Sequence, residues 1–117
     1  MLFEKDSKQI ICKKVRLRIS LVSKMIGLMF SNRAQIEDTA HIFIFTKPIF
    51  LSLHMWFVFY PIDVLFIDSN KKIVDIKQNF LPFTFYTAQK KAKFFIEVKK
   101  GLIKKKNLLI GSSVEWT

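Results

Sequence analysis

The sequence predicts a small, mostly β domain: a sandwich or barrel of about seven short strands with one or two short helices. Its 117 residues are the length of one domain, so we expect residues 1–117 to share a single core. Short runs rich in Ile, Val and Phe alternate with polar or proline-containing breaks, as in strands joined by turns. A helical pattern is confined to Lys24–Met29, which Ser23 can cap, and to one turn within 99–107.

The N-terminal elements follow from simple alternation. Residues 1–7 are polar, and we expect them to be frayed. Polar and apolar residues alternate over 14–21, which predicts a half-buried strand with a basic outer face. A polar connection over 31–39 precedes a predicted strand at His41–Phe45, which should end at Lys47-Pro48.

The most apolar part of the chain is Phe50–Tyr60. It is apolar on both faces, so we expect an inner strand rather than an edge strand. Every residue between Lys47 and Asp63 is uncharged, but this run is shorter than the about 20 residues that a membrane-spanning helix needs. It also ends at Pro61, so we expect no membrane span.

Four further strands complete the prediction. Asp63–Asp68 and Ile73–Ile76 flank the polar turn Ser69–Lys72 and should form a hairpin. Lys93–Val98 is a strand that alternates poorly because most of its residues are apolar. A last short strand is expected at Ser113–Trp116.

The order of several short motifs gives the chain a family resemblance. The motifs are Gly27-Leu28-Met29-Phe30, Phe43-Ile44-Phe45, a segment from His54 through Pro61-Ile62-Asp63 to Asp68, Lys72-Ile73-Val74, and Ile96-Glu97-Val98 with Gly101 behind it. In this order and spacing they resemble the uncharacterised family called domain of unknown function 192, over roughly Val15 to Trp116. The resemblance implies a small β-sandwich domain and no particular activity.

The chain departs from this family pattern in three ways. Many members have Trp-Met-Lys-Asn-Thr where this chain has His54-Met55-Trp56-Phe57-Val58, so a site built on that Lys-Asn pair is absent. An arginine directly follows Gly-Leu-Met-Phe in many relatives, whereas Ser31 stands here. Many bacterial relatives are exported, but acidic residues occupy the place of a basic leader in this chain. We therefore expect a cytoplasmic protein.

One candidate pocket combines polar groups with adaptable apolar walls. It would lie beside Asp63, with His54, Met55, Trp56 and Met29 as its other members. A desolvated Asp63 could act as an acid, a base or a cation ligand. The alternative, which we favour, is that Asp63 accepts backbone N–H bonds at a strand entrance and that the others fill the core.

A strongly basic composition suggests a polyanionic partner. The formal charge is +11, and all basic residues except Arg16, Arg18 and Arg33 are lysines. Nucleic acid or an anionic membrane surface would suit such a charge, although a lysine-rich compositional bias also explains it and is the interpretation that we favour. The candidate polyanion contacts lie in the C-terminal third: Lys90, Lys91, Lys93, Lys104, Lys105 and Lys106.

These patterns favour a binding or interaction domain without an evident catalytic site. Its partner could be nucleic acid or a protein, including a second copy of the chain. The alternatives are sequence-nonspecific nucleic-acid binding through lysines, and an enzyme that uses Asp63 and His54. No cofactor or metal is expected, because Cys12 is the single cysteine and no phosphate-binding loop or metal-ligand spacing is present.

Overall fold

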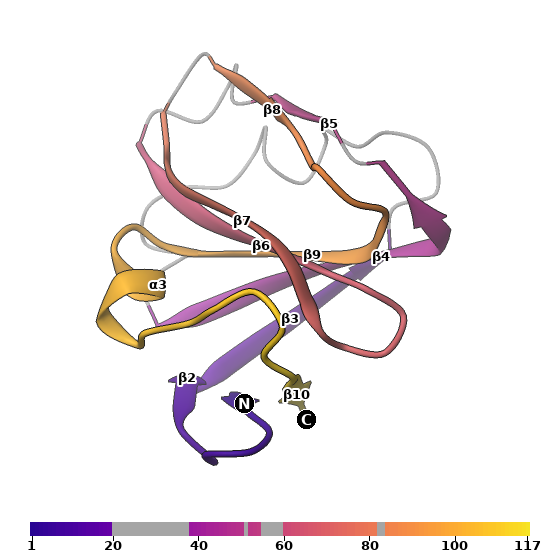
Figure 1. The fold of residues 1–117 in the computed structure, drawn as a ribbon. Helices are drawn as coiled ribbons and strands as arrows, with labels where there is room; N and C mark the ends of the chain where they lie inside the picture. Colours follow the sequence, from indigo (N-terminus) through magenta and orange to yellow (C-terminus); the bar gives the residue numbers. More distant parts are fainter. Residues whose placement is uncertain (20–37, 51, 55–59, 82–83) are drawn as a thin grey trace.

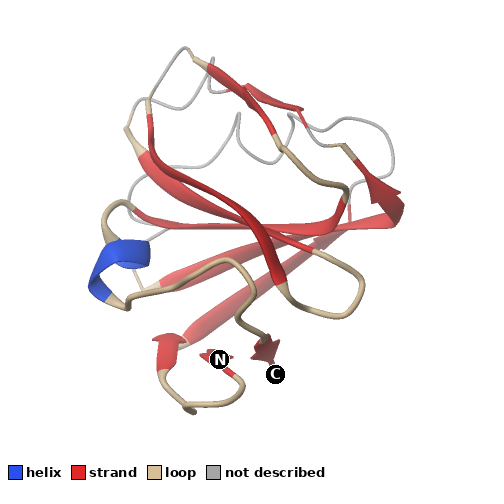
Figure 2. Ribbon diagram, viewed as in Figure 1, coloured by secondary structure: helices blue, strands red, loops and turns tan. Residues whose placement is uncertain are grey.

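The computed structural model describes residues 1–19, 38–50, 52–54, 60–81 and 84–117 (Figure 1). These residues form ten strands and one short helix, in sheets of five, three and two strands (Figure 2). The expected mostly β fold is therefore confirmed. The strand number is higher than predicted because several strands have only three residues, too few to show an alternating pattern.

The five-stranded sheet is the centre of the fold. Its order is β3 (Lys14–Ile19), β4 (Thr39–Ile49), β9 (Ala92–Lys99), β6 (Ile62–Ile67) and β7 (Ile73–Phe80). The β3–β4 pair is parallel, and the other three pairs are antiparallel. All six residues of β6 are buried, as expected for an inner strand with both faces covered. β7 forms one edge of this sheet.

The β6–β7 hairpin follows the sequence prediction. Asp68 Oδ1 accepts hydrogen bonds from the backbone N–H groups of Asn70 and Lys72, each at 2.9 Å. This is the way in which Asp side chains favour tight turns. Lys71 adopts a positive φ of 63°, which closes the turn between the two strands.

The phenylalanines pack mostly on one face of the five-stranded sheet. Phe43, Phe66, Phe80 and Phe95 belong to one core layer, and the rings of Phe43 and Phe95 stack with their centroids 4.4 Å apart. The two-stranded sheet of β5 (Ser52–His54) and β8 (Phe85–Thr87) lies against this layer. Tyr86 of β8 makes the contact, through its ring against Phe66 and Phe80.

The opposite face carries a second, aliphatic core layer. Its members include Leu65 and Ile96 from the inner strands, because successive side chains of a strand point to opposite faces. The short helix α3 (Leu102–Lys105) covers this face through Ile103. The three-stranded sheet of β2 (Ile10–Cys12), β1 (Leu2–Glu4) and β10 (Val114–Trp116) covers the rest.

The N-terminus is ordered, contrary to the expected fraying of residues 1–7. Leu2 is completely buried in the aliphatic layer, and β1 pairs with both β2 and β10. The two ends of the chain lie side by side (Figure 1), and the Met1 ammonium donates a hydrogen bond of 2.9 Å to the Thr117 carbonyl. The burial of Leu2 and the pairing of β1 on both of its edges anchor this segment.

The prediction for Phe50–Tyr60 was wrong where the structure describes it. The described strand is only β5, which pairs with β8 and does not join the five-stranded sheet, and Phe50 is 54% exposed. The inner strands of that sheet are instead β4, β9 and β6. Apolar content predicted burial, but it could not predict which neighbours the strand would have. The predicted helix over Lys24–Met29 lies outside the described residues.

Candidate functional site

Asp63 is a buried carboxylate whose two oxygens both accept hydrogen bonds. Its side chain is 1% exposed. Oδ1 accepts from the backbone N–H of Asn79 at 2.8 Å, and Oδ2 accepts from those of Gly101 at 3.0 Å and Ile103 at 3.2 Å. The carboxylate therefore joins the start of β6 to the end of β7 and to the beginning of α3. This is the structural role that the sequence favoured.

The geometry places Asp63 on the aliphatic face of the large sheet. Its carboxylate points towards α3, whereas β5, which contains the backbone of His54, lies over the phenylalanine face with β8. The structure does not bring this carboxylate and β5 to the same face. The side chain of His54 and the whole of Met29, Met55 and Trp56 lie outside what the structure describes, so their role in a pocket stays a prediction.

A second buried carboxylate, Asp75, organises the outer edge of β7. Its Oδ1 accepts from the backbone N–H of Ile76 at 2.8 Å. Its Oδ2 accepts from the Tyr86 hydroxyl and from the backbone N–H of Gln89, both at 2.8 Å. Burial, followed by this hydrogen bond and the charge of Asp75, raises the pKa of Tyr86 above its ordinary value of 10.0. The phenol therefore remains a hydrogen-bond donor at neutral pH.

A third group of buried polar residues was missed by sequence reasoning. His41 and Glu97 are completely buried and lie opposite each other in the β4–β9 ladder. The nearby Tyr60 has a pKa raised to about 12 by burial and then by the charge of Glu97. Period-2 alternation could not reveal this pair, because apolar residues surround each of them on both sides.

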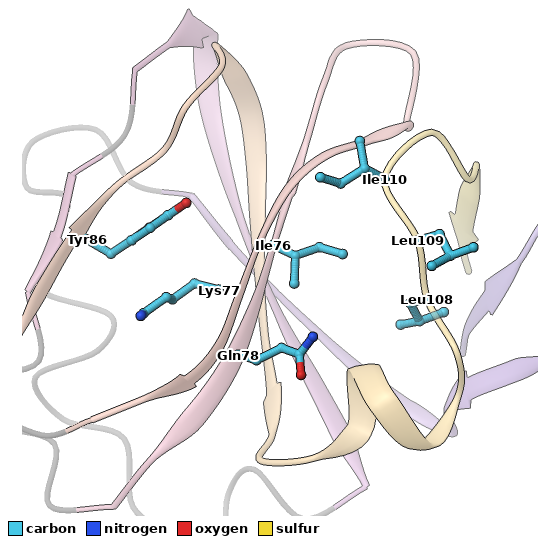
Figure 3. A pocket seen from close by; sticks show the side chains of 7 residues that line it. All are labelled: Ile76, Lys77, Gln78, Tyr86, Leu108, Leu109 and Ile110. Carbon is cyan, nitrogen blue, oxygen red and sulfur yellow. The ribbon is translucent and has the colours of Figure 1, made fainter.

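An open hollow of about 800 Å³ lies along the outer edge of β7. Its lining residues are Ile76, Lys77, Gln78, Tyr86, Leu108, Leu109 and Ile110. Figure 3 shows Ile76 and Ile110 extending towards each other across the gap between β7 and the segment that follows α3. Lys77 and Tyr86 lie on the other side of β7, with the Lys77 ammonium 5.4 Å from the centroid of the Tyr86 ring (Figure 3).

Two aliphatic side chains on the walls of this hollow are more than half exposed to solvent. Leu109 is 60% and Ile110 is 63% exposed, whereas the neighbouring Leu108 is buried. Three consecutive apolar residues in a connection between predicted elements, Leu108, Leu109 and Ile110, were the sequence signal for this surface. Sequence reasoning missed it because it looked for polar groups inside strands.

The six candidate lysines form two groups at opposite ends of β9. Lys90, Lys91 and Lys93 lie at its start, and Lys104 to Lys106 follow its end, in and after α3. Eight strand residues at about 3.3 Å each separate the two groups by about 25 Å. They are therefore two surfaces and not one continuous patch.

The described residues offer little for metal or thiol chemistry. Among them, no three His, Cys, Asp or Glu side chains gather closely enough to hold a metal ion. Burial raises the pKa of the Cys12 thiol from its ordinary 9.0 to about 12, so little of the nucleophilic thiolate forms at neutral pH. No helix in the described part has the length and apolar content to cross a membrane.

The fold and these contacts define a small, mostly β domain in which two of the buried carboxylates, Asp63 and Asp75, act as structural ties. The chain belongs to the family described as Uncharacterized ACR, domain of unknown function 192, which matches residues 1–116. It is 31% identical to a UPF0127 protein of Thermococcus sibiricus over 99% of this chain and 74% of that protein. It is also 31% identical to a UPF0127 protein of Pyrococcus furiosus, over 88% of this chain and 86% of the relative.

Two crystal structures share the fold. One is a provisionally assigned transcription regulator from Sinorhizobium meliloti, with a TM-score of 0.74 and 22% identity over 86% of this chain and 79% of that chain. The other is a protein of unknown function from Novosphingobium aromaticivorans, with a TM-score of 0.73 and 22% identity over 87% of this chain and 74% of that chain. At this identity the likeness establishes the fold alone.

Proposed function

We propose that this protein is a non-catalytic binding domain and that its ligand site is the hollow beside β7. The observation that supports this most is the pair of adjacent aliphatic side chains, Leu109 and Ile110, that stay more than half exposed on the wall of that hollow. A volume of about 800 Å³ is within the range of ligand sites in proteins. Apolar walls with a few polar groups are also their usual composition.

The polar groups of the hollow suit binding better than chemistry. Among the residues that the structure describes, its lining has no carboxylate, imidazole or thiol. The Gln78 amide can both donate and accept hydrogen bonds, and Lys77 supplies a positive charge to a ligand that reaches across the edge strand β7 to its other side. The Tyr86 hydroxyl already donates to Asp75. Such a set can orient an anionic, partly apolar ligand, but it has no pair of groups that could exchange a proton near neutral pH.

Nuclear magnetic resonance on ¹⁵N-labelled protein tests this function. The probes are octanoate and octyl phosphate, each an apolar chain with an anionic head. We expect both to shift the amide signals of Ile76, Lys77, Gln78 and Leu108 to Gly111, and Ile110→Ser should weaken the effect. The control is Leu17→Ser, which changes an aliphatic side chain that is 57% exposed on β3. Shifts that spread elsewhere, or their absence from these residues, would refute the proposed site.

A further inference from the structure

We propose that the surface around the hollow docks the protein onto an anionic lipid bilayer. The surface consists of Lys100, Lys104, Lys105, Lys106, Leu109 and Ile110, and we call it the α3 surface. The inference rests on the proposed function, because the hollow proposed as the ligand site opens onto the α3 surface. It names the partner that this surface would bind.

The first argument is the charge of the α3 surface. Between Val98 and Val114 the chain carries five lysines and no acidic residue. Lys100, Lys104 and Lys105 are exposed, and Lys106 is partly exposed. The Glu4 carboxylate comes near the Lys106 end of this segment, because the Gln9 side-chain amide donates both to Glu4 Oε1 at 3.4 Å and to the Lys106 carbonyl at 2.8 Å. One carboxylate against five lysines still leaves a local positive field. Basic clusters of this kind are attracted to the negative potential of anionic lipid headgroups.

The second argument is the position of the exposed aliphatic pair. Leu109 lies three residues after Lys106, so about 10 Å of extended chain is the greatest distance between them. In Figure 1 the segment after α3 leaves the helix directly and runs across the sheet towards β10. Lysines at headgroup level with aliphatic side chains beside them are the pattern by which proteins bind in a membrane interface.

The third argument separates a lipid surface from the other polyanions. Single-stranded nucleic acid binds on aromatic rings that stack with bases, whereas the exposed apolar pair here is aliphatic. Protein interfaces are enriched in Arg and depleted in Lys, and between Val98 and Val114 every basic residue is a lysine. The lysine ammonium is a strongly hydrated point charge. Such a charge suits the phosphates of lipid headgroups, which move laterally and form a diffuse layer.

The other lysine group provides a matched control. Lys90 and Lys91 are exposed like Lys104 and Lys105, so both pairs can be replaced with the same change in net charge. The two apolar residues nearest to them along the chain, Ala88 and Ala92, are small and buried. If vesicle binding depended on the net charge of the protein alone, replacing either lysine pair would weaken it equally.

Co-sedimentation with lipid vesicles tests the inference. One set is pure phosphatidylcholine, and in the other about a third of the lipid is phosphatidylglycerol, which gives an anionic surface. We expect binding to the second set only. The double variant Lys104→Gln with Lys105→Gln should weaken binding about 25-fold, since each lysine contributes about fivefold. The control, Lys90→Gln with Lys91→Gln, should weaken binding less than fivefold. Leu109→Ser with Ile110→Ser should weaken it at least tenfold, and Phe85→Ser, which changes a side chain that is 69% exposed on β8, should not. Thermal melting confirms that each variant is folded.

Several outcomes would overturn the inference. One is equal loss of vesicle binding by the two lysine pairs, and another is undiminished binding by the Leu109/Ile110 variant. A third is wild-type binding to a DNA oligonucleotide but not to anionic vesicles, which would favour a nucleic-acid partner. If wild type ignores the vesicles while octanoate still shifts the amides of the hollow, the membrane inference fails and the proposed function stands. If octanoate fails as well, both are wrong.

Discussion

Replacing Asp63 by Asn tests whether both oxygens of its carboxylate are structural. An amide has one acceptor oxygen, so its NH₂ group must face either the N–H of Asn79 or those of Gly101 and Ile103. The least costly arrangement keeps the oxygen on the Gly101 side and loses the bond to Asn79. A hydrogen bond to a buried charged group contributes about 2 kcal/mol, so we expect Asp63→Asn to lower the free energy of unfolding by at least that amount.

Asp68→Asn is the control, because one oxygen of Asp68 accepts both of its backbone hydrogen bonds. An Asn oxygen can accept the same two bonds, so the change should cost about 0.5 kcal/mol or less. Urea unfolding at neutral pH measures both values, and hydrogen exchange should show the amides of Asn79, Gly101 and Ile103 opening faster in Asp63→Asn only. Equal stabilities for the two variants would refute the two-oxygen account.

The other contacts give three further predictions. Tyr86→Phe removes the donor to Asp75 and should cost about 1 to 2 kcal/mol in urea unfolding, and a neutral result would mean that the Ile76 and Gln89 bonds suffice. Phe66→Ala empties a fully buried site between two sheets and should cost about 3 to 5 kcal/mol, whereas Phe85→Ala at an exposed site should cost less than about 1 kcal/mol. Burial raises the pKa of Cys12 from 9.0 and that of Tyr60 from 10.0, each to about 12. Below pH 9 both groups are neutral in the folded and in the unfolded chain, so they leave the free energy of unfolding unchanged. As the pH rises towards 12 they ionise in the unfolded chain first, which lowers the free energy of unfolding. Cys12→Ala should flatten the first part of that decline in thermal melts, and an unchanged pH profile would show that the thiol is accessible.

Local chemistry carried most of the correct predictions about the fold. The turn at Asp68 to Lys72 was predictable because an Asp side chain satisfies the turn's own amides, with no help from the rest of the chain. The strands near Ile62–Ile67 and Ala92–Lys99 were predictable from β-branched and aromatic content. The interactions that form the turn lie within the segment itself, whereas the strands were recognisable from composition although they pair with other segments.

Errors arose where long-range contacts decide the structure. Leu2 is buried because it pairs with Trp116, at the other end of the sequence, and with Cys12 in the next strand. Leu17 belongs to the apolar face of an alternating strand, yet it is exposed because β3 forms the edge of the sheet. Neither the pairing of Leu2 nor the edge position of β3 can be recognised from the residues beside them in the sequence.

The candidate site could be predicted only in part. The buried position of Asp63 followed from its apolar surroundings, but its partners Gly101 and Ile103 lie about 40 residues away and could not be named. The hollow was not predicted, because Ile76 and Ile110 are brought together by tertiary structure alone. The lysines were identified from composition, whereas their division between the two ends of β9 required the strand itself.

Hydrogen exchange in the presence of vesicles rich in phosphatidylglycerol would locate the binding surface most directly. The full chain is compared with and without the vesicles, and exchange is followed by mass spectrometry of peptides. If the surface beside β7 is the binding site, protection should be confined to peptides that cover Gly101–Gly111 and Ile76–Gln78. Protection of the Lys90–Lys93 end of β9, or none in either region, would contradict this account.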